Sequence, residues 1–93
     1  MKNINLPVSI FKFLIKNKKI LLLKRCNTGF NDRKWSVPAG RLNNIETIRK
    51  AAVREAREEV NSLIKISDLS MPLVMHHKDA KGVRIYFFIL CEL

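Results

Sequence analysis

The stretch Asn44–Asn61 reads NIETIRKAAVREAREEVN and decides the fold. It contains neither proline nor glycine, and its apolar residues recur at spacings of three, four or seven positions, as on a helix with one apolar face. These apolar positions are Ile45, Ile48, Ala52, Ala56 and, just beyond the stretch, Leu63. We therefore predict an amphipathic helix over residues 44–61. Its start has two candidates, because Asn43 and Glu46 have the spacing of a capping box and Thr47 is a competing N-cap.

Three glutamates lie within one turn of this predicted helix. Glu55, Glu58 and Glu59 stand at positions i, i+3 and i+4, so their carboxylates can converge. Glu59 projects along the apolar stripe and Glu55 lies beside it. A carboxylate that faces a core is costly unless it is paired or bound to a cation, which favours a divalent metal site. The alternative is a solvated helix face on which Arg54 pairs with Glu58, and the residue types alone leave both open.

An antiparallel hairpin is predicted before the helix. In Val8–Ile15, the apolar residues Phe11, Phe13 and Ile15 recur at every second position, which favours a strand over a short helix. Residues 16–19 read as a turn, and Ile20–Leu23 as the second strand.

The remaining segments alternate between turn formers and strand formers. Before the helix, these are a loop at Cys26–Lys34, a short strand at Trp35–Val37 ended by Pro38, and a loop opened by Ala39 and Gly40. After the helix, they are strands at Pro72–His77 and Val83–Cys91, joined by a turn over residues 79–82. One helix among several strands predicts an α+β fold in one domain, residues 1–93.

Composition and charge narrow the class of protein. The apolar share is 47%, which is ordinary for a globular domain and argues against disorder. No apolar run approaches a membrane span, Lys12 and Lys16 interrupt the apolar stretch near the N-terminus, and two cysteines are too few for a disulfide framework. These features predict a cytoplasmic protein.

The net charge of +10 points to an anionic partner. Four of the eight acidic residues lie within residues 44–62, where four basic residues balance them, so the rest of the chain carries the whole excess. A small acidic focus in a basic protein has the character of a cation site that receives an anion such as a nucleotide.

The residues from Gly40 to Glu59 resemble the Nudix box. Gly40, five residues, Glu46, seven residues and then Arg54-Glu55-Ala56-Arg57-Glu58-Glu59 match the signature at six charged or glycine positions. The preceding segments 27–30 and 35–40, NTGF and WSVPAG, are similar to those before the box in MutT-like members. Asn61 and Ser62 replace the closing glycine and hydrophobic residue, and asparagine also tolerates a left-handed helix end. Leu63 is expected to supply the apolar contact one place late.

The resemblance implies a Nudix-type α/β/α sandwich with a mixed sheet. Domains of this family typically continue through a further strand and a second helix, so this chain is expected to lack those C-terminal elements. It also implies a hydrolase that uses Mg²⁺, or Mn²⁺, to cleave a diphosphate linkage in a nucleoside diphosphate derivative. Nucleoside triphosphates are the first expectation for the substrate, and ADP-ribose, dinucleotide cofactors and capped RNA are the alternatives.

The family's residue roles carry over to matching positions. Glu55, Glu58 and Glu59 would bind metal, helped by a main-chain carbonyl at Ala39 or Gly40. Glu55 would orient or deprotonate the attacking water, although in some relatives the base lies outside the box. Arg54 would hold Glu55 by an ion pair, and Glu46 would support the loop or an outer metal site.

Residues outside the box have weaker signals. Arg25 and Arg41 are candidates for phosphate contacts, and Phe30 and Trp35 for stacking on a nucleobase, although surface charge and loop packing explain them equally well. His76 and His77 are expected on opposite faces of a strand in structural roles. One rival is a catalytically inactive Nudix-like module that binds a nucleotide or RNA, and another is a small basic nucleic-acid-binding domain. A homodimer would cover an otherwise exposed apolar sheet face.

Overall fold

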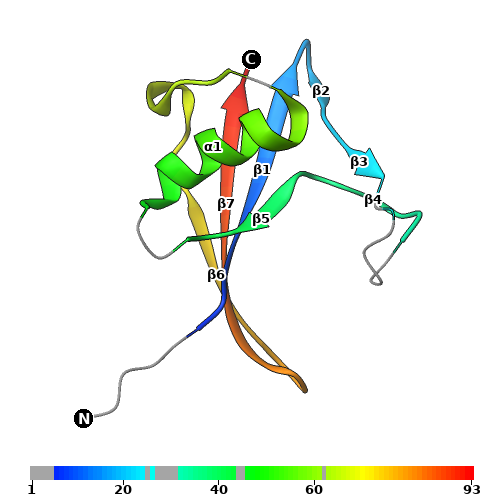
Figure 1. The fold of residues 1–93 in the computed structure, drawn as a ribbon, viewed down its shortest axis with the longest axis vertical. Helices are drawn as coiled ribbons and strands as arrows, with labels where there is room; N and C mark the ends of the chain where they lie inside the picture. The colour runs from blue at the N-terminus through cyan, green and yellow to red at the C-terminus, as the bar shows by residue number, and fades with distance from the viewer. Residues whose placement is uncertain (1–5, 25, 27–31, 44–45, 62) are drawn as a thin grey trace.

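A five-stranded mixed sheet forms the framework of the computed structural model, which describes residues 6–24, 26, 32–43, 46–61 and 63–93. Its two long strands, β1 (Val8–Lys16) and β7 (Gly82–Glu92), run parallel. The other strands pair antiparallel: β6 (Leu73–Asp79) with β7, and both β2 (Lys19–Ile20) and β5 (Ala39–Arg41) with β1. Helix α1 (Ile48–Val60) lies across β1 and β7 (Figure 1). The mixed sheet and single helix confirm the predicted α+β fold.

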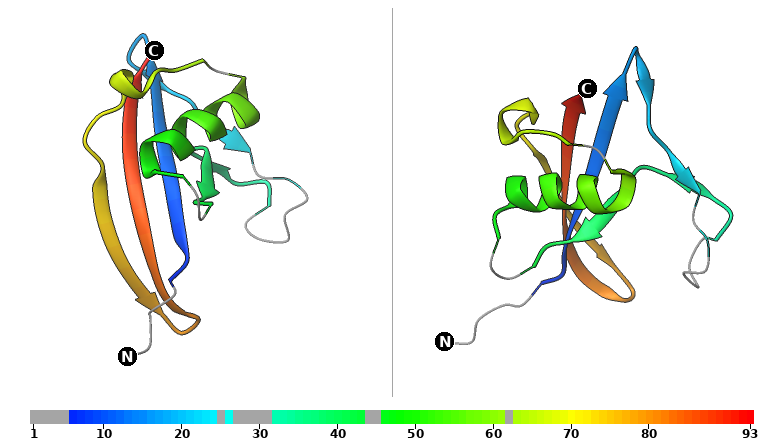
Figure 2. Two further views of the ribbon diagram at one scale, coloured as in Figure 1. Left: turned by 60° about the vertical axis from the view of Figure 1, so that its left-hand side comes forward. Right: turned by 45° about the horizontal axis from the view of Figure 1, so that its top comes forward.

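The core lies between α1 and one face of the sheet. Small side chains on the helix allow close packing against larger apolar residues on the strands. The buried members are Ile10, Leu14, Ala51, Ala52, Ala56, Ile64, Leu69, Ile89 and Cys91. Figure 2 (left) presents the sheet nearly on edge, with α1 and the loop that carries β5 on the same side. Among the described residues, no helix covers the opposite face.

Aromatic side chains cover much of that opposite face. Phe11 and Phe88 stack with ring centroids 5.1 Å apart, and Tyr86 meets Phe11 edge to face at 5.2 Å. His77 stacks on Tyr86, with ring centroids 5.5 Å apart, and pairs with Asp79. Its neighbour His76 also belongs to β6, so the two side chains point to opposite faces of the sheet, as predicted. In the part of the chain with described structure, no helix has the length and apolar character of a membrane span.

Both ends of α1 are fixed by local side chains. Thr47, one of the two predicted N-cap candidates, is the N-cap: its hydroxyl accepts a hydrogen bond from the Lys50 amide at 3.2 Å, so the helix begins at Ile48. Residues 44–45 lie outside the described part of the chain. Asn61 ends the helix in the left-handed conformation, with φ 53° and ψ 34°. Leu63 is 82% exposed, so its predicted apolar contact is wrong, and the buried Ile64 takes that place.

Substitution of glycine for Asn61 is expected to stabilise the domain by about 0.5–1 kcal/mol, because glycine adopts φ 53° without a steric penalty. Asn61→Ala should lower stability by about 1 kcal/mol, because the Cβ atom of alanine is strained in the left-handed conformation and its side chain makes no compensating hydrogen bond. Urea unfolding of the three chains measures both effects. Equal stability of the glycine and alanine variants would contradict the left-handed cap.

Three segments differ from the sequence-based prediction. Ala39 and Gly40 belong to strand β5, and not to a loop, because their main chain pairs with Ile10 and Phe11 of β1. The predicted strand at residues 20–23 divides between β2 and β3 (Leu23–Lys24), and β3 pairs with β4 (Trp35–Ser36) in a separate two-stranded sheet. A short 3₁₀ helix, η1 (Ile66–Asp68), was not predicted. The β6–β7 hairpin confirms the two strands expected after the helix.

Candidate active site

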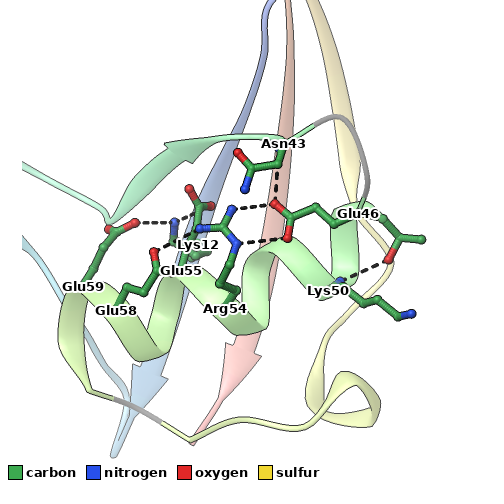
Figure 3. Close-up of polar contacts among 9 residues, drawn as sticks. Lys12, Asn43, Glu46, Lys50, Arg54, Glu55, Glu58 and Glu59 are labelled. Atoms are coloured by element: carbon green, nitrogen blue, oxygen red, sulfur yellow. Dashed lines mark hydrogen bonds and ion pairs between the residues drawn. The ribbon is translucent and has the colours of Figure 1, made fainter.

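A buried lysine bridges two of the three glutamates on α1. Lys12 belongs to β1 and faces the helix, and it is only 1% exposed. Its Nζ donates to Oε1 of Glu55 at 3.0 Å and to Oε1 of Glu59 at 3.1 Å (Figure 3). Lys12 thus supplies the positive charge that allows a carboxylate to lie against the core.

Glu55 fits into a space that only glycine leaves open. Gly40 lies opposite Ile10 in the pairing of β5 with β1. A Cβ atom added to Gly40 would lie 1.4 Å from Oε2 of Glu55, so the carboxylate occupies the volume that any other residue would fill. The glycine of the motif is therefore required for close approach, since it has no side chain to exclude the carboxylate.

Burial raises the pKa of Glu55, which is 4% exposed. Loss of solvent raises the pKa of this carboxyl, while the hydrogen bond and charge of Lys12 act in the opposite direction. The nearby charge of Glu59 raises the pKa further, to a smaller extent. A carboxylate with a raised pKa is a better proton acceptor near neutral pH than an exposed one.

A second ion-pair cluster lies on the outer side of the helix. Arg54 donates from Nε to Oε2 of Glu46 at 3.0 Å and from Nη1 to Oε2 of Glu58 at 3.0 Å. Glu46 also accepts a hydrogen bond from the Asn43 amide at 3.3 Å, so it joins the loop before α1 to the helix. The Arg54 guanidinium lowers the pKa of Glu46, and this carboxylate raises the pKa of Arg54 in return.

This cluster corrects the predicted partner of Arg54. The described hydrogen bonds of Arg54 go to Glu46 and Glu58, and not to Glu55. Adjacent helical residues diverge by about 100°, so Arg54 points outward where Glu55 points inward. The contact between Arg54 and Glu58 is the ion pair that we expected if this face of the helix were solvated.

The three glutamates of helix α1 do not meet at one point. Glu55 and Glu59 share Lys12, whereas the side chain of Glu58 is 60% exposed beside Arg54. Among the described residues, no three acidic, histidine or cysteine side chains are grouped closely enough to hold an ion. The predicted burial order is also reversed, since Glu55 is buried and Glu59 is exposed.

A hollow beside Glu59 explains this exposure and offers room for a ligand. It has a volume of about 250 Å³ and is lined by Glu59, strand β3, and the main chain that leads into β5. The lining residues are Leu23, Lys24, Cys26, Ser36, Val37, Pro38, Ala39 and Glu59. A larger hollow of about 620 Å³ lies on the outer side of α1 next to Arg54 and Glu58, and neither Glu55 nor Glu59 lines it. The smaller hollow, which adjoins Glu59 and the main chain before Gly40, is therefore the candidate binding site.

The residues predicted for substrate binding are placed differently from one another. Trp35 lies on β4 and is 63% exposed, so its ring is accessible. Arg41 is exposed and pairs with Ser9, which puts it on the face of the sheet opposite Lys12. Arg25 and Phe30 lie outside the described residues. The structure therefore does not bring Arg41 to the glutamates.

Lys12 is the site residue that sequence reasoning missed. The available signal was its alternation, because Ile10, Lys12 and Leu14 share the inward face of β1. A lysine in such a position needs a buried anion as its partner, and the glutamates beside the apolar stripe of the helix are candidates for that partner.

Comparisons with known proteins give the family. The model of the NUDIX domain matches residues 5–92. An ADP-ribose pyrophosphatase of Methanocaldococcus jannaschii is 32% identical over 75 residues, which cover 81% of this chain and 44% of that protein.

Solved structures have the same fold. A MutT/nudix family protein from Enterococcus faecalis superposes with a TM-score of 0.86 at 20% identity, over 100% of this chain and 39% of the other. The bifunctional NMN adenylyltransferase/ADP-ribose pyrophosphatase of Francisella tularensis, complexed with AMP and a manganese ion, gives a TM-score of 0.80 at 25% identity, over 96% and 28%. This chain thus spans less than half the length of each of these relatives. Because the family model covers nearly all of its residues, the chain belongs to the NUDIX domain family.

Proposed function

We propose that this domain is a divalent-metal-dependent hydrolase that cleaves a diphosphate linkage within a nucleoside diphosphate derivative. The observation that carries the proposal is the fit of the buried Glu55 carboxylate against Gly40, which joins two distant positions of the box in one site. A buried glutamate costs stability unless it is neutralised, and in this site Lys12 and the proposed metal ion are the cations that would neutralise it.

The donor groups suit Mg²⁺ or Mn²⁺. Glu55, Glu58 and Glu59 supply carboxylate oxygens, and Mg²⁺ prefers oxygen donors while keeping positions for water and phosphate. The Glu55 and Glu59 oxygens already bind a cation, the ammonium of Lys12, which supports their capacity to hold positive charge. The main-chain carbonyl of Ala39 or Gly40 is proposed as a further donor. When bound, the ion polarises phosphoryl oxygens and acidifies water.

The chain's own residues then divide the remaining work. Glu55 accepts or directs the proton of the attacking water. Arg54 positions Glu58 and fixes the loop through Glu46. The hollow beside Glu59 receives the diphosphate, and Lys24 on its wall adds positive charge. Trp35 is accessible for stacking on a base.

ADP-ribose is the first substrate to test. The Methanocaldococcus jannaschii relative, 32% identical over most of this chain, is named an ADP-ribose pyrophosphatase. Nucleoside triphosphates, the expectation from the approach to the box, form the second arm of the test. Activity on triphosphates alone would favour a pyrophosphohydrolase that releases a nucleoside monophosphate.

Glu58→Gln is expected to lower Mg²⁺-dependent hydrolysis by about 100-fold or more, because several kcal/mol of metal stabilisation depends on its charge. The fold should remain intact, since the Arg54–Glu58 pair is exposed and contributes about 0.5 kcal/mol. The measurement is turnover of ADP-ribose and of the nucleoside triphosphates with products separated. Glu92→Gln, at the exposed end of β7, is the matched control and should retain full activity.

The outcomes separate the proposed enzyme from a binding module. Turnover that is retained in Glu58→Gln would remove Glu58 from the site. Steeply salt-dependent RNA binding by a folded chain, with no hydrolysis of any substrate, would favour the inactive module. In that case Glu55 and Glu59 would serve only as partners of Lys12.

A further inference from the structure

Lys12 binds one oxygen of each of two carboxylates, those of Glu55 and Glu59, that the proposed function assigns to a metal ion. We propose that Lys12 is a built-in counter-cation. In the metal-free domain it holds Glu55 and Glu59 in place, and a divalent ion must compete with it, so Lys12 lowers the metal affinity of this site. This inference rests on the proposed function, because it requires that the two glutamates are metal ligands. Lys12 is a positioning residue, since its 1% exposure leaves it no access to a substrate.

The contacts of Lys12 place it in the way of an ion. Its Nζ lies 3.0 Å from Oε1 of Glu55 and 3.1 Å from Oε1 of Glu59, so one oxygen of each carboxylate is engaged. Oε2 of Glu55 is turned to Gly40. An ion that binds both carboxylates either shares Oε1 with the ammonium, displaces it, or binds the second oxygen of the same carboxylates, and every one of these arrangements brings two positive charges close together.

Burial makes this competition costly. Lys12 lies between Ile10 and Leu14 on the inward side of β1, and both neighbours are buried. An ammonium in such surroundings has little solvent to move into if it loses its carboxylates. Charge repulsion is also stronger there than in water, because the effective dielectric constant is lower.

The same contact stabilises the domain when no metal is present. Without Lys12, the buried carboxylate of Glu55 would face the core with no cation, and Glu59 would add a like charge nearby. Lys12 thus allows the site to form before metal arrives. Part of the metal's binding free energy is therefore offset by the loss of the contacts between Lys12 and the two carboxylates.

Lys12→Met tests the inference, because methionine keeps an unbranched side chain of similar length and removes the charge. Binding of Mn²⁺ is followed through the spectrum of the free ion, in titrations without nucleotide. The dissociation constant is expected to fall by about tenfold or more, as repulsion from a neighbouring charge is removed. The rise of Tm on addition of Mn²⁺ should also be larger than in the wild type. Lys16→Met, at the exposed end of the same strand, is the matched control and should bind as the wild type does.

A second measurement uses the wild-type protein and does not depend on folding of the variant. The Lys12 ammonium resonance, assigned through its side-chain carbons in ¹⁵N-labelled protein, should shift as Mg²⁺ saturates the site. The ammonium resonances of exposed lysines should stay in place.

Each contrary result has a separate meaning. Equal or weaker Mn²⁺ binding by Lys12→Met, or a Lys12 resonance that is unmoved at saturation, would overturn the inference and leave the proposed metal site standing. Absence of Mn²⁺ binding in the folded wild-type and variant chains would overturn both.

Discussion

Gly40→Ala is expected to abolish hydrolysis and to destabilise the domain by about 1–3 kcal/mol, the usual cost of forcing extra atoms into a packed site. The new methyl group would lie 1.4 Å from Oε2 and 2.4 Å from Cδ of Glu55, so the whole carboxyl group would have to move. Glu55 would have to leave its place, and its hydrogen bond to Lys12 would be strained or lost. Turnover and urea unfolding, measured side by side, check both effects.

Gly82→Ala is the matched control for this substitution. Gly82 has φ +127°, so alanine is strained there by about 1–3 kcal/mol, but no atom lies within 4 Å of its added Cβ. Both variants should lose stability, and only Gly40→Ala should lose activity. Full activity in Gly40→Ala would contradict the placement of the Glu55 carboxylate against Gly40.

Glu55→Met is expected to destabilise the domain by about 3–5 kcal/mol in metal-free solution, because it removes the buried partner of a buried ammonium. Lys12 would keep only Glu59, whose side chain is 26% exposed. The double variant Lys12→Met/Glu55→Met should recover most of this loss, because an apolar pair of similar size can replace a buried ion pair. Unfolding by urea in the presence of a chelator gives the free energies.

A control at the neighbouring ion pair separates burial from charge. Glu58→Met breaks the exposed contact with Arg54 and should cost less than about 1 kcal/mol. If Glu55→Met costs no more than Glu58→Met, or if the double variant is no more stable than Glu55→Met alone, Lys12 is not held by a buried charge pair.

Features that depend on neighbours in sequence were predicted well. The helix follows from the spacing of its apolar residues, and the left-handed Asn61 from the tolerance of asparagine for that conformation. The β6–β7 hairpin follows from two apolar segments around a short turn. Each of these depends on residues within about one or two turns, or one hairpin, of each other.

Features that depend on pairing across the chain were not predicted. The role of Lys12 requires β1 to pass beneath the helix, 43 positions away from Glu55 in sequence. The strand character of Gly40 comes from its pairing with β1, and nothing in the local sequence specifies that partner. The reversed burial of Glu55 and Glu59 likewise depends on where the hollow beside β3 lies, which helical periodicity does not contain.

The parallel pairing of β1 with β7 has a consequence for how the chain folds. Val8 pairs with Ile85 and Ile15 with Glu92, so the two central strands come from opposite ends of the sequence. Contacts of such high contact order form slowly, since a long loop must close before they give any stability. During synthesis, Lys12 and Glu55 leave the ribosome well before Ile89 and Cys91, which belong to the core on which the helix packs. We therefore expect the pair between Lys12 and Glu55 to be solvated until β7 has paired with β1, and to become buried only then.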